Sequence, residues 1–370
     1  MRSPESGVHL APLTTLGLGG PARWYARAES EDDVREAHAW AGRRGVPLFV
    51  LAGGSNVVIA DEGFDGLVLH VALRGVSQAR DGDDVLVTAA AGEGWDDLVA
   101  QTVRQGLSGL ECLSGIPGTV GGTPIQNVGA YGQEVAQSIA SVSVFDRAGD
   151  AQSALAAEAC EFGYRTSRFK TREAGRFIVC AVTFRLRHGD ATVAYPDVVD
   201  HLSRRGTTSP AIRDVRDAVL EIRRSKGMVL DAGDVDTRSV GSFFTNPVVT
   251  EHVVDELASR VGLRVPAYAA GPGMRKVPAA WLLDQAGFSR GYGAGAVGLS
   301  SKHPLAIINR GDGSARSVVT FAVDIKRRVA ERFGITLVPE PTFVGFGDDE
   351  DVGYLVRGSR EPGCGGTVQP

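Results

Sequence analysis

Two glycine-rich segments constrain this chain more than any other feature of its sequence. The first is the run Gly53-Gly54-Ser55-Asn56, which directly follows a short apolar stretch, and the second spans residues 114–132, where six of 19 residues are glycine. Glycine permits dihedral angles and close approaches that a Cβ forbids, so such a loop can direct several N–H groups at one phosphate. A tight turn between strands explains either segment alone. The pair indicates loops that together hold a diphosphate-linked cofactor and let backbone press against its ring system.

Helix and strand patterns alternate along the rest of the chain, without an internal repeat. Ser30 followed by three acidic residues, with Arg43 and Arg44 before Gly45, has the cap and charges of a helix. This mixture favours an α+β fold in several subdomains over a regular doubly wound sheet. Expected strands are Leu48 to Ala52, Leu67 to Val71, Val85 to Ala91, Ile139 to Phe145, Phe177 to Leu186, Leu305 to Asn309 and Ile335 to Val338. Further expected helices are Trp95 to Val103, Ile212 to Ile222, Val253 to Ser259, Pro278 to Ala286 and Ser317 to Phe333.

Length and charge exclude several classes of protein. A chain of 370 residues is too long for one compact core and predicts two or three domains. Its net charge of −5 argues against a general nucleic-acid binder. We find no apolar run long enough for a transmembrane helix and no secretory signal, so we expect a cytoplasmic protein. The region 347–370 is rich in Gly, Asp and Glu, and we expect a disordered tail there.

Metal and nucleotide motifs of other kinds are weak. The four cysteines and seven histidines show neither metal-ligand spacing nor a redox pair, so we expect no metal site. Gly293, Gly295 and Gly298 form a G-x-G-x-x-G pattern, but no clear strand precedes it and Pro304 interrupts a following helix. A dinucleotide fingerprint requires both elements, and a flexible glycine loop is the better interpretation.

Seven segments in a fixed order make the pattern specific. The segments are Thr14 to Gly20, Gly53 to Asn56, Gly109 to Glu111 with Ser114 to Gly132, Gly163 to Lys170, Gly241 to Pro247, Ala280 to Gln285, and Val338 to Pro341. With these segments, residues 13–346 closely resemble the UDP-N-acetylenolpyruvoylglucosamine reductases, also called UDP-N-acetylmuramate dehydrogenases or MurB. Each motif alone is weak, and their order carries the resemblance.

The resemblance implies a cytoplasmic flavoenzyme with non-covalently bound FAD and three structural parts. These are a first FAD-binding subdomain at 1–72 with a return segment at 335–346, a second FAD-binding subdomain at 73–222, and an α+β substrate-binding domain at 223–334. By similarity, NADPH reduces the FAD and then leaves. UDP-N-acetylglucosamine enolpyruvate takes its place and is reduced to UDP-N-acetylmuramate, a peptidoglycan precursor. The implied partners are these small molecules, without an obligate protein partner.

Three residues match the catalytic positions of the family. Hydride addition to the enolpyruvyl methylene leaves negative charge on the adjacent carbon and its carboxylate, and stabilising this charge is the main catalytic task. Arg165 matches the cationic residue, whose planar guanidinium stays charged and forms two hydrogen bonds. Glu340, between two prolines at the end of the expected strand, matches the catalytic glutamate, and its acid form would donate to the enolate. Ser242 matches the proton donor that quenches the carbanion.

Other family positions are expected to bind cofactor and substrate. We assign Tyr195, Lys226 and Asn246 to the substrate's diphosphate and nucleotide, and Lys276 to a substrate or NADPH phosphate. Tyr195 resembles the tyrosine of a substrate-covering loop, although Pro196 follows it where glycine is expected. Arg223 and Arg224 precede Lys226, which is also typical of a solvated helix end. The expected FAD contacts are Leu51, Gly53, Gly54, Ser55, Asn56, Gly122, Ile125 and Gly129.

Two other functions remain open at this point. One is a different FAD-dependent oxidase or dehydrogenase with the same cofactor fold, which separate and widely spaced positions of the three catalytic residues would favour. The other is a flavin- or nucleotide-binding regulator without catalysis.

Overall fold

The computed structural model describes residues 3–191 and 193–358, beginning with a mixed sheet of strand order β1-β2-β5-β3. Strands β2 and β3 both run parallel to β5. Helix α1 packs against β2 and β5, and begins at Ser30, whose side chain accepts a hydrogen bond from the Asp33 N–H. Gly45 ends it in the left-handed conformation at φ 63°. The bounds are β1 Glu5–His9, β2 Pro21–Ala28, α1 Glu31–Arg44, β3 Leu48–Leu51 and β5 Phe64–Val71.

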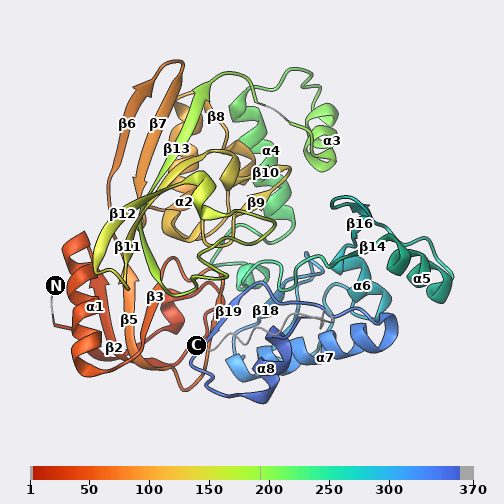
Figure 1. The fold of residues 1–370 in the computed structure, drawn as a ribbon. Helices are drawn as coiled ribbons and strands as arrows, with labels where there is room; N and C mark the ends of the chain where they lie inside the picture. Colours follow the sequence, from red (N-terminus) through yellow and green to blue (C-terminus); the bar gives the residue numbers. More distant parts are fainter. Residues whose placement is uncertain (1–2, 192, 359–370) are drawn as a thin grey trace.

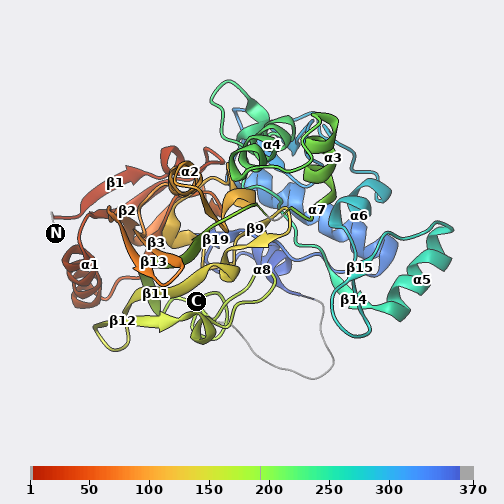
Figure 2. The same ribbon diagram turned by 90° about the horizontal axis from the view of Figure 1, so that it is seen from above.

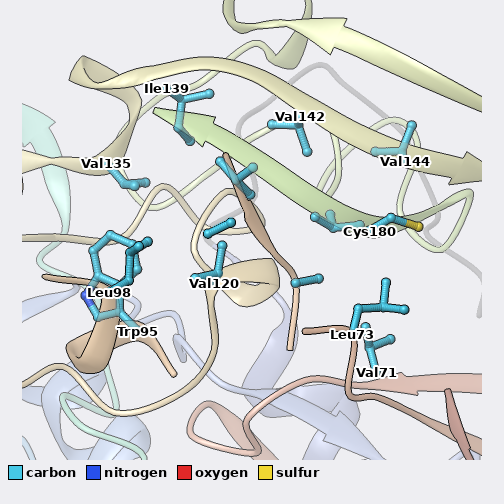
Figure 3. Close-up of a cluster of buried hydrophobic side chains, with 14 of the residues drawn as sticks. Val71, Leu73, Trp95, Leu98, Val120, Val135, Ile139, Val142, Val144 and Cys180 are labelled. Carbon is cyan, nitrogen blue, oxygen red and sulfur yellow. The ribbon is translucent and has the colours of Figure 1, made fainter. Parts of the chain in front are cut away.

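A second, antiparallel sheet lies above the first in Figure 1, with the strand order β12-β11-β13-β7-β6 and β8 paired to β13. Helix α2 packs into its core through Trp95 and Leu98. Figure 3 shows side chains from α2, the loop around Val120 and strands β11 and β13 meeting in one apolar cluster. The bounds are β6 Val76–Asp81, β7 Asp84–Ala90, α2 Trp95–Arg104, β8 Leu107–Ser108, β9 Gly129–Ala130, β10 Gln133–Glu134, β11 Ile139–Asp146, β12 Ala151–Ala156 and β13 Phe177–His188.

The chain from residue 248 onward forms a third region beside these sheets, as Figures 1 and 2 show in teal and blue. Helices α3 and α4 pack on each other next to the second sheet, where α4 contacts α2, whereas α6 and α7 share a separate apolar core with β17 and β18. The bounds are α3 Pro196–Arg204, α4 Ile212–Ser225, β14 Val248–Thr250, α5 Glu251–Val261, β15 Tyr268–Ala269, β16 Met274–Lys276, α6 Ala279–Gln285, β17 Val297–Leu299, β18 Ile307–Asn309 and α7 Ala315–Phe333. Short 3-10 helices lie at Ala11–Leu13, Glu111–Leu113, Val120–Gly122, Val135–Gln137, Ala157–Cys160 and Val235–Thr237.

The chain returns to the amino-terminal part near its end. Strand β19, Thr342–Val344, pairs in parallel with β4, Val57–Ile59, directly after the first glycine loop. The strand expected at Ile335 to Val338 is wrong, because that segment contains no strand. Pro339 is bridged to Phe244 but lacks an N–H, so it cannot extend a regular ladder.

The expectation of disorder is wrong for residues 350–356, which form helix α8, Glu350–Val356. The Asp349 side chain caps it, and its buried Val352 and Leu355 pack with α7. Lys326 of α7 donates to the Leu355 carbonyl at 2.6 Å, which satisfies part of the free carboxyl end of α8. The rest of the expected tail, 359–370, lies outside the described residues. Within 3–191 and 193–358, no helix combines the length and hydrophobicity that a bilayer crossing requires.

Candidate active site

A cavity of about 490 Å³ is lined by all three regions of the molecule. Its walls include every residue expected to contact FAD and all three expected catalytic residues. Three of the four expected substrate residues, Tyr195, Lys226 and Asn246, line it as well, whereas Lys276 does not. Segments from residue 49 to residue 342 therefore converge on a single site.

The two glycine loops form one wall of this cavity by packing against each other. A Cβ added to Gly53 would lie 2.5 Å from the Cα of Gly118, and one added to Gly118 would lie 2.7 Å from the Ser55 hydroxyl. Gly118 also has φ 116°, a conformation that L-residues rarely adopt. Gly53 is therefore required by the close contact between the two loops. From the sequence, we expect the glycines to make room for the ring system of the cofactor instead. The resulting wall consists of backbone and small side chains.

Two residues that line this cavity carry unsatisfied polar atoms, which fits a phosphate-bearing ligand. The residues are Thr119 and Arg223, whose hydroxyl and Nε are buried and have no hydrogen-bond partner within residues 3–191 and 193–358. Unpaired buried polar groups are costly, so a ligand that accepts hydrogen bonds stabilises them. One donor is a guanidinium, which suits a diphosphate. Together with the two glycine loops, these residues fit FAD.

Arg165 comes from a tight turn at 163–166, closed by hydrogen bonds between Gly163 and Thr166. Arg165 itself has φ 54°, an uncommon conformation for a non-glycine residue and a form of strain found at functional sites. Its Nη2 donates to the Gly129 carbonyl at 2.6 Å. A Cβ on Gly129 would lie 2.9 Å from the Arg165 Nη1, so the glycine leaves room for the guanidinium.

Glu340 faces Arg165 across the cavity corner, with the Arg165 Nε 3.3 Å from the Glu340 Oε1 and only 14% of the glutamate side chain exposed. Burial raises the pKa of Glu340, and the neighbouring cations Arg165 and Lys170 oppose that rise. The backbone of Glu340 is fixed because its N–H donates to the Phe243 carbonyl at 2.8 Å. The carboxyl is therefore a buried group whose proton affinity depends on its cationic neighbours.

Ser242 reaches the same cavity from the segment that holds Glu340. It directly precedes Phe243, the residue that accepts the Glu340 N–H, and it follows Gly241 at φ 77°. Phe243 and Phe244 are buried and contact each other at a ring distance of 5.1 Å. This aromatic anchor fixes the backbone on which the serine hydroxyl is carried. The three residues share one cavity, which is the opposite of the arrangement expected for an unrelated oxidase.

The outer end of the cavity is formed by α3, α4 and the third region. Tyr195 is the N-cap residue of α3, and Pro196 occupies the first helical position, where its fixed φ is favourable. The Tyr195 ring meets Tyr131 edge-on at 5.4 Å. Lys226 ends α4 and pairs with Asp197 at 2.8 Å.

The other two expected substrate residues have contacts within the protein. The Asn246 Oδ1 accepts from the Ala279 N–H at 2.8 Å and so caps α6. Lys276 lies with its ammonium 4.5 Å from the centre of the Tyr164 ring, and Tyr164 does line the cavity. Lys276 therefore adjoins the site through Tyr164.

Among the residues of the cavity wall to which sequence reasoning gave no role are Arg223 and His303. Arg223 is only 9% exposed, although it belongs to a run that is typical of a solvated helix end. Its spacing with Val215, Val219 and Ile222 on the apolar face of α4 was the available signal. The histidines show no ligand spacing, so the sequence predicts no role for His303, which nevertheless lines the cavity. Burial lowers its pKa to about 4, and the nearby cations Lys226 and Arg223 act in the same direction.

Comparisons with known proteins agree with this geometry. Residues 22–154 match the model of an FAD binding domain, and residues 233–344 match the C-terminal domain of UDP-N-acetylenolpyruvoylglucosamine reductase. The reductase of Thermobifida fusca is 47% identical over 91% of this chain and 97% of its own length. That of Streptomyces coelicolor is 46% identical over 91% of this chain and 89% of its own. The crystal structure of the reductase from Thermus caldophilus has a TM-score of 0.62 and 26% identity, covering 92% of this chain and 99% of that one.

Proposed function

The chain belongs to the UDP-N-acetylenolpyruvoylglucosamine reductase family, and from this premise we propose that its cavity is where Arg165, Ser242 and Glu340 carry out the family reaction. The protein is an FAD-dependent oxidoreductase that uses NADPH to reduce UDP-N-acetylglucosamine enolpyruvate to UDP-N-acetylmuramate for peptidoglycan synthesis. One observation supports the residue assignment above all others. Arg165, Ser242 and Glu340 are far apart in the sequence and line one cavity together with both glycine loops.

We assign FAD to the wall formed by the glycine loops. The residues that would hold it are Leu51, Gly53, Gly54, Ser55, Asn56, Gly122, Ile125 and Gly129, with Arg223 and Thr119 as additional donors. When bound, FAD supplies the hydride that it has received from NADPH. The protein's part is to fix that ligand by backbone contacts and to neutralise its diphosphate.

Arg165 and Glu340 stabilise the negative charge that develops on the substrate carboxylate. The guanidinium offers two N–H groups in one plane and keeps its charge at any working pH. Because Glu340 is buried, its pKa is raised, which favours a protonated carboxyl that donates a hydrogen bond. Both groups act in a site partly shielded from water, where electrostatic interactions are strong.

Ser242 delivers the proton that completes the reaction, from its Oγ to the carbon that bears the ether oxygen. A hydroxyl is a weak acid, so it serves only when held against a strongly basic carbanion. The buried Phe243 and Phe244 support this by fixing the adjacent backbone and excluding water on that side. Tyr195, Lys226, Asn246 and Lys276 would bind the UDP portion at the outer end of the cavity.

We further propose that the enzyme works in the cytoplasm, where NADPH and UDP-sugars are made, and without an obligate protein partner. The domain limits at 72, 222 and 334, with the return at 335–346, stay our proposal; the β19–β4 pair and the separate apolar core of α6 and α7 support it.

The experiment that tests the function is product analysis. Purified protein, NADPH and UDP-N-acetylglucosamine enolpyruvate should yield the lactyl ether, identified by mass spectrometry. NADPH oxidation without that product would favour another flavin oxidase or dehydrogenase. Failure of NADPH to react at all would favour a non-catalytic regulator.

A further inference from the structure

Lys170 lies in the catalytic corner, and neither the mechanism above nor the sequence pattern gives it a task. It lines the cavity and is half-buried. Its loop is well anchored: the Lys170 N–H donates to the Ser167 carbonyl at 3.1 Å, and the Ser167 hydroxyl donates to the Ile125 carbonyl at 2.6 Å. The preceding Phe169 is buried and packs on Phe177. The lysine is therefore held at a defined place beside the cofactor wall.

The ammonium of Lys170 contacts the backbone of Glu340. Its Nζ lies 3.3 Å from the Glu340 carbonyl oxygen, and the Asn56 Nδ2 lies at the same distance from that oxygen on the side of the first glycine loop. On the other side, the Glu340 N–H is bound to Phe243, next to Ser242. The glutamate is thus clamped from two sides, and Lys170 provides the charged contact of this clamp.

The charges that face the Glu340 carboxyl come from one loop. Arg165 is in direct contact with it, Lys170 adds a second positive charge, and Tyr164 is a neutral phenol nearby. The other elements packed against Glu340 present Asn56 and the segment 243–245, which carry no charged side chain. The Lys170 pKa is lowered by burial and by Arg165, while Glu340 raises it. Lys170 and Glu340 are therefore electrostatically coupled.

We propose that Lys170 is a positioning residue for the sugar-nucleotide half of the reaction, fixing the Glu340 backbone and setting the charge state of its carboxyl through the adjacent ammonium. This inference rests on the function proposed above and adds a residue to it. Lys170 acts through Glu340, so it has no part in the reaction of NADPH with the flavin. The positive charge of Lys170 also acts on the Glu340 carboxyl without direct contact: it stabilises the ionised carboxylate, and its removal favours the acid form.

The test uses the FAD-loaded protein with Lys170→Gln, the conservative Lys170→Arg, and Arg172→Gln as a matched control. Arg172 lies two residues away in the same loop, pairs with Glu161 and is 57% exposed, so its variant removes one positive charge outside the cavity. Anaerobic stopped-flow measurements follow flavin reduction by NADPH and reoxidation by UDP-N-acetylglucosamine enolpyruvate across pH. A second readout is independent of turnover: carbon NMR of protein labelled at the glutamate carboxyls, with the Glu340 signal assigned from its loss in Glu340→Gln.

We expect Lys170→Gln to be reduced by NADPH at the wild-type rate. Because the Glu340 backbone loses its charged contact, reoxidation should be roughly tenfold to a hundredfold slower, although the acid form of Glu340 is then favoured. Glu340 should titrate at higher pH in this variant. The part of the pH profile of reoxidation that reflects the titration of Glu340 should shift to higher pH by the same amount. Lys170→Arg should restore both properties, and Arg172→Gln should match the wild type.

Three outcomes overturn the inference. These are an unchanged Glu340 titration, equal loss in both half-reactions, or a Lys170→Gln protein that no longer retains FAD, since the lysine would then be a general structural residue. If the wild-type flavin is reduced but not reoxidised by the enolpyruvyl sugar, the proposed function fails. If the wild type is reoxidised and Lys170→Gln behaves identically, only the role of Lys170 fails.

Discussion

The two walls of the cavity are built in different ways. The wall assigned to FAD consists of glycine loops in backbone contact, where Gly53 and Gly118 leave no room for a Cβ. The adjoining catalytic corner is formed by charged side chains, with Arg165 and Glu340 3.3 Å apart. The first wall depends on local shape and the second on electrostatic balance between distant parts of the chain. Substitutions in the two walls should therefore impair different half-reactions, and their effects should depend differently on pH.

The largest expected effect belongs to Ser242→Ala. If Ser242 is the proton donor, reoxidation by UDP-N-acetylglucosamine enolpyruvate should slow by about 10³–10⁴-fold, the upper range of general acid catalysis. Flavin reduction by NADPH should stay near the wild-type rate, because no proton from Ser242 is needed there. Stopped-flow absorbance of the flavin measures both steps. An equal fall in the rates of flavin reduction and reoxidation would mean that Ser242 has a structural role in the cavity and is not the proton donor.

Arg165→Lys should be the next most severe change. A lysine keeps the charge but cannot reproduce the two-donor geometry, and we expect a loss of about 10²–10³-fold in reoxidation. The substitution also places a lysine at φ 54°, as strained as the arginine, so backbone effects are matched. Near-normal turnover would remove Arg165 from the mechanism.

Gly53→Ala should damage the other wall. The added methyl meets the backbone of Gly118 at 2.5 Å, and the loops must separate at a cost of about 3 kcal/mol. We expect weaker FAD retention and a lower melting temperature. Gly122→Ala is the control for stability, because its Cβ would meet only the Ala52 side chain at 3.8 Å. Equal destabilisation by both substitutions would contradict the packing argument.

The smallest effect concerns pH and His303. Its folded pKa of about 4 lies below the ordinary value of 6.5, so the folded state binds fewer protons than the unfolded state in this interval. Stability attributable to His303 is complete above pH 6.5 and is lost as pH falls through 4. Denaturant unfolding at several pH values should show that the free energy of unfolding falls by roughly 1–2 kcal/mol over this interval. In His303→Gln the free energy of unfolding should depend less on pH. The cost of Gly53→Ala should not change with pH, and a parallel pH slope would remove the distinction between the walls.

Local signals in the sequence accounted for much of the fold. Helix α1 follows the Ser30 cap and Gly45 stop, and α2 follows the spacing of Trp95 and Leu98. The α+β class and the family are confirmed. Pairing between distant segments was not predictable locally: Thr342–Val344 pairs with β4 although Ile335 to Val338 has the stronger apolar pattern. Helix α8 was missed because acidic and glycine-rich composition outweighed its short apolar spacing at Val352 and Leu355.

The same distinction between local signals and contacts of distant segments applies to the candidate site. Residues in distinctive motifs, such as Arg165, Ser242 and Glu340, could be named from the sequence through the resemblance, and their roles stay predictions. His303 and Lys170 could not be named in this way, since each owes its position to segments remote in the chain. A basic residue at a helix end is normally solvated, and for Arg223 only its spacing on the apolar face of α4 indicates burial.

The most direct test is an anaerobic absorption spectrum of the purified protein before and after two additions. The account predicts a yellow, FAD-containing protein whose flavin band is lost with NADPH and regained with UDP-N-acetylglucosamine enolpyruvate. A protein without flavin, or one that NADPH bleaches and the enolpyruvyl sugar leaves bleached, would contradict the claim that both walls serve one reductase.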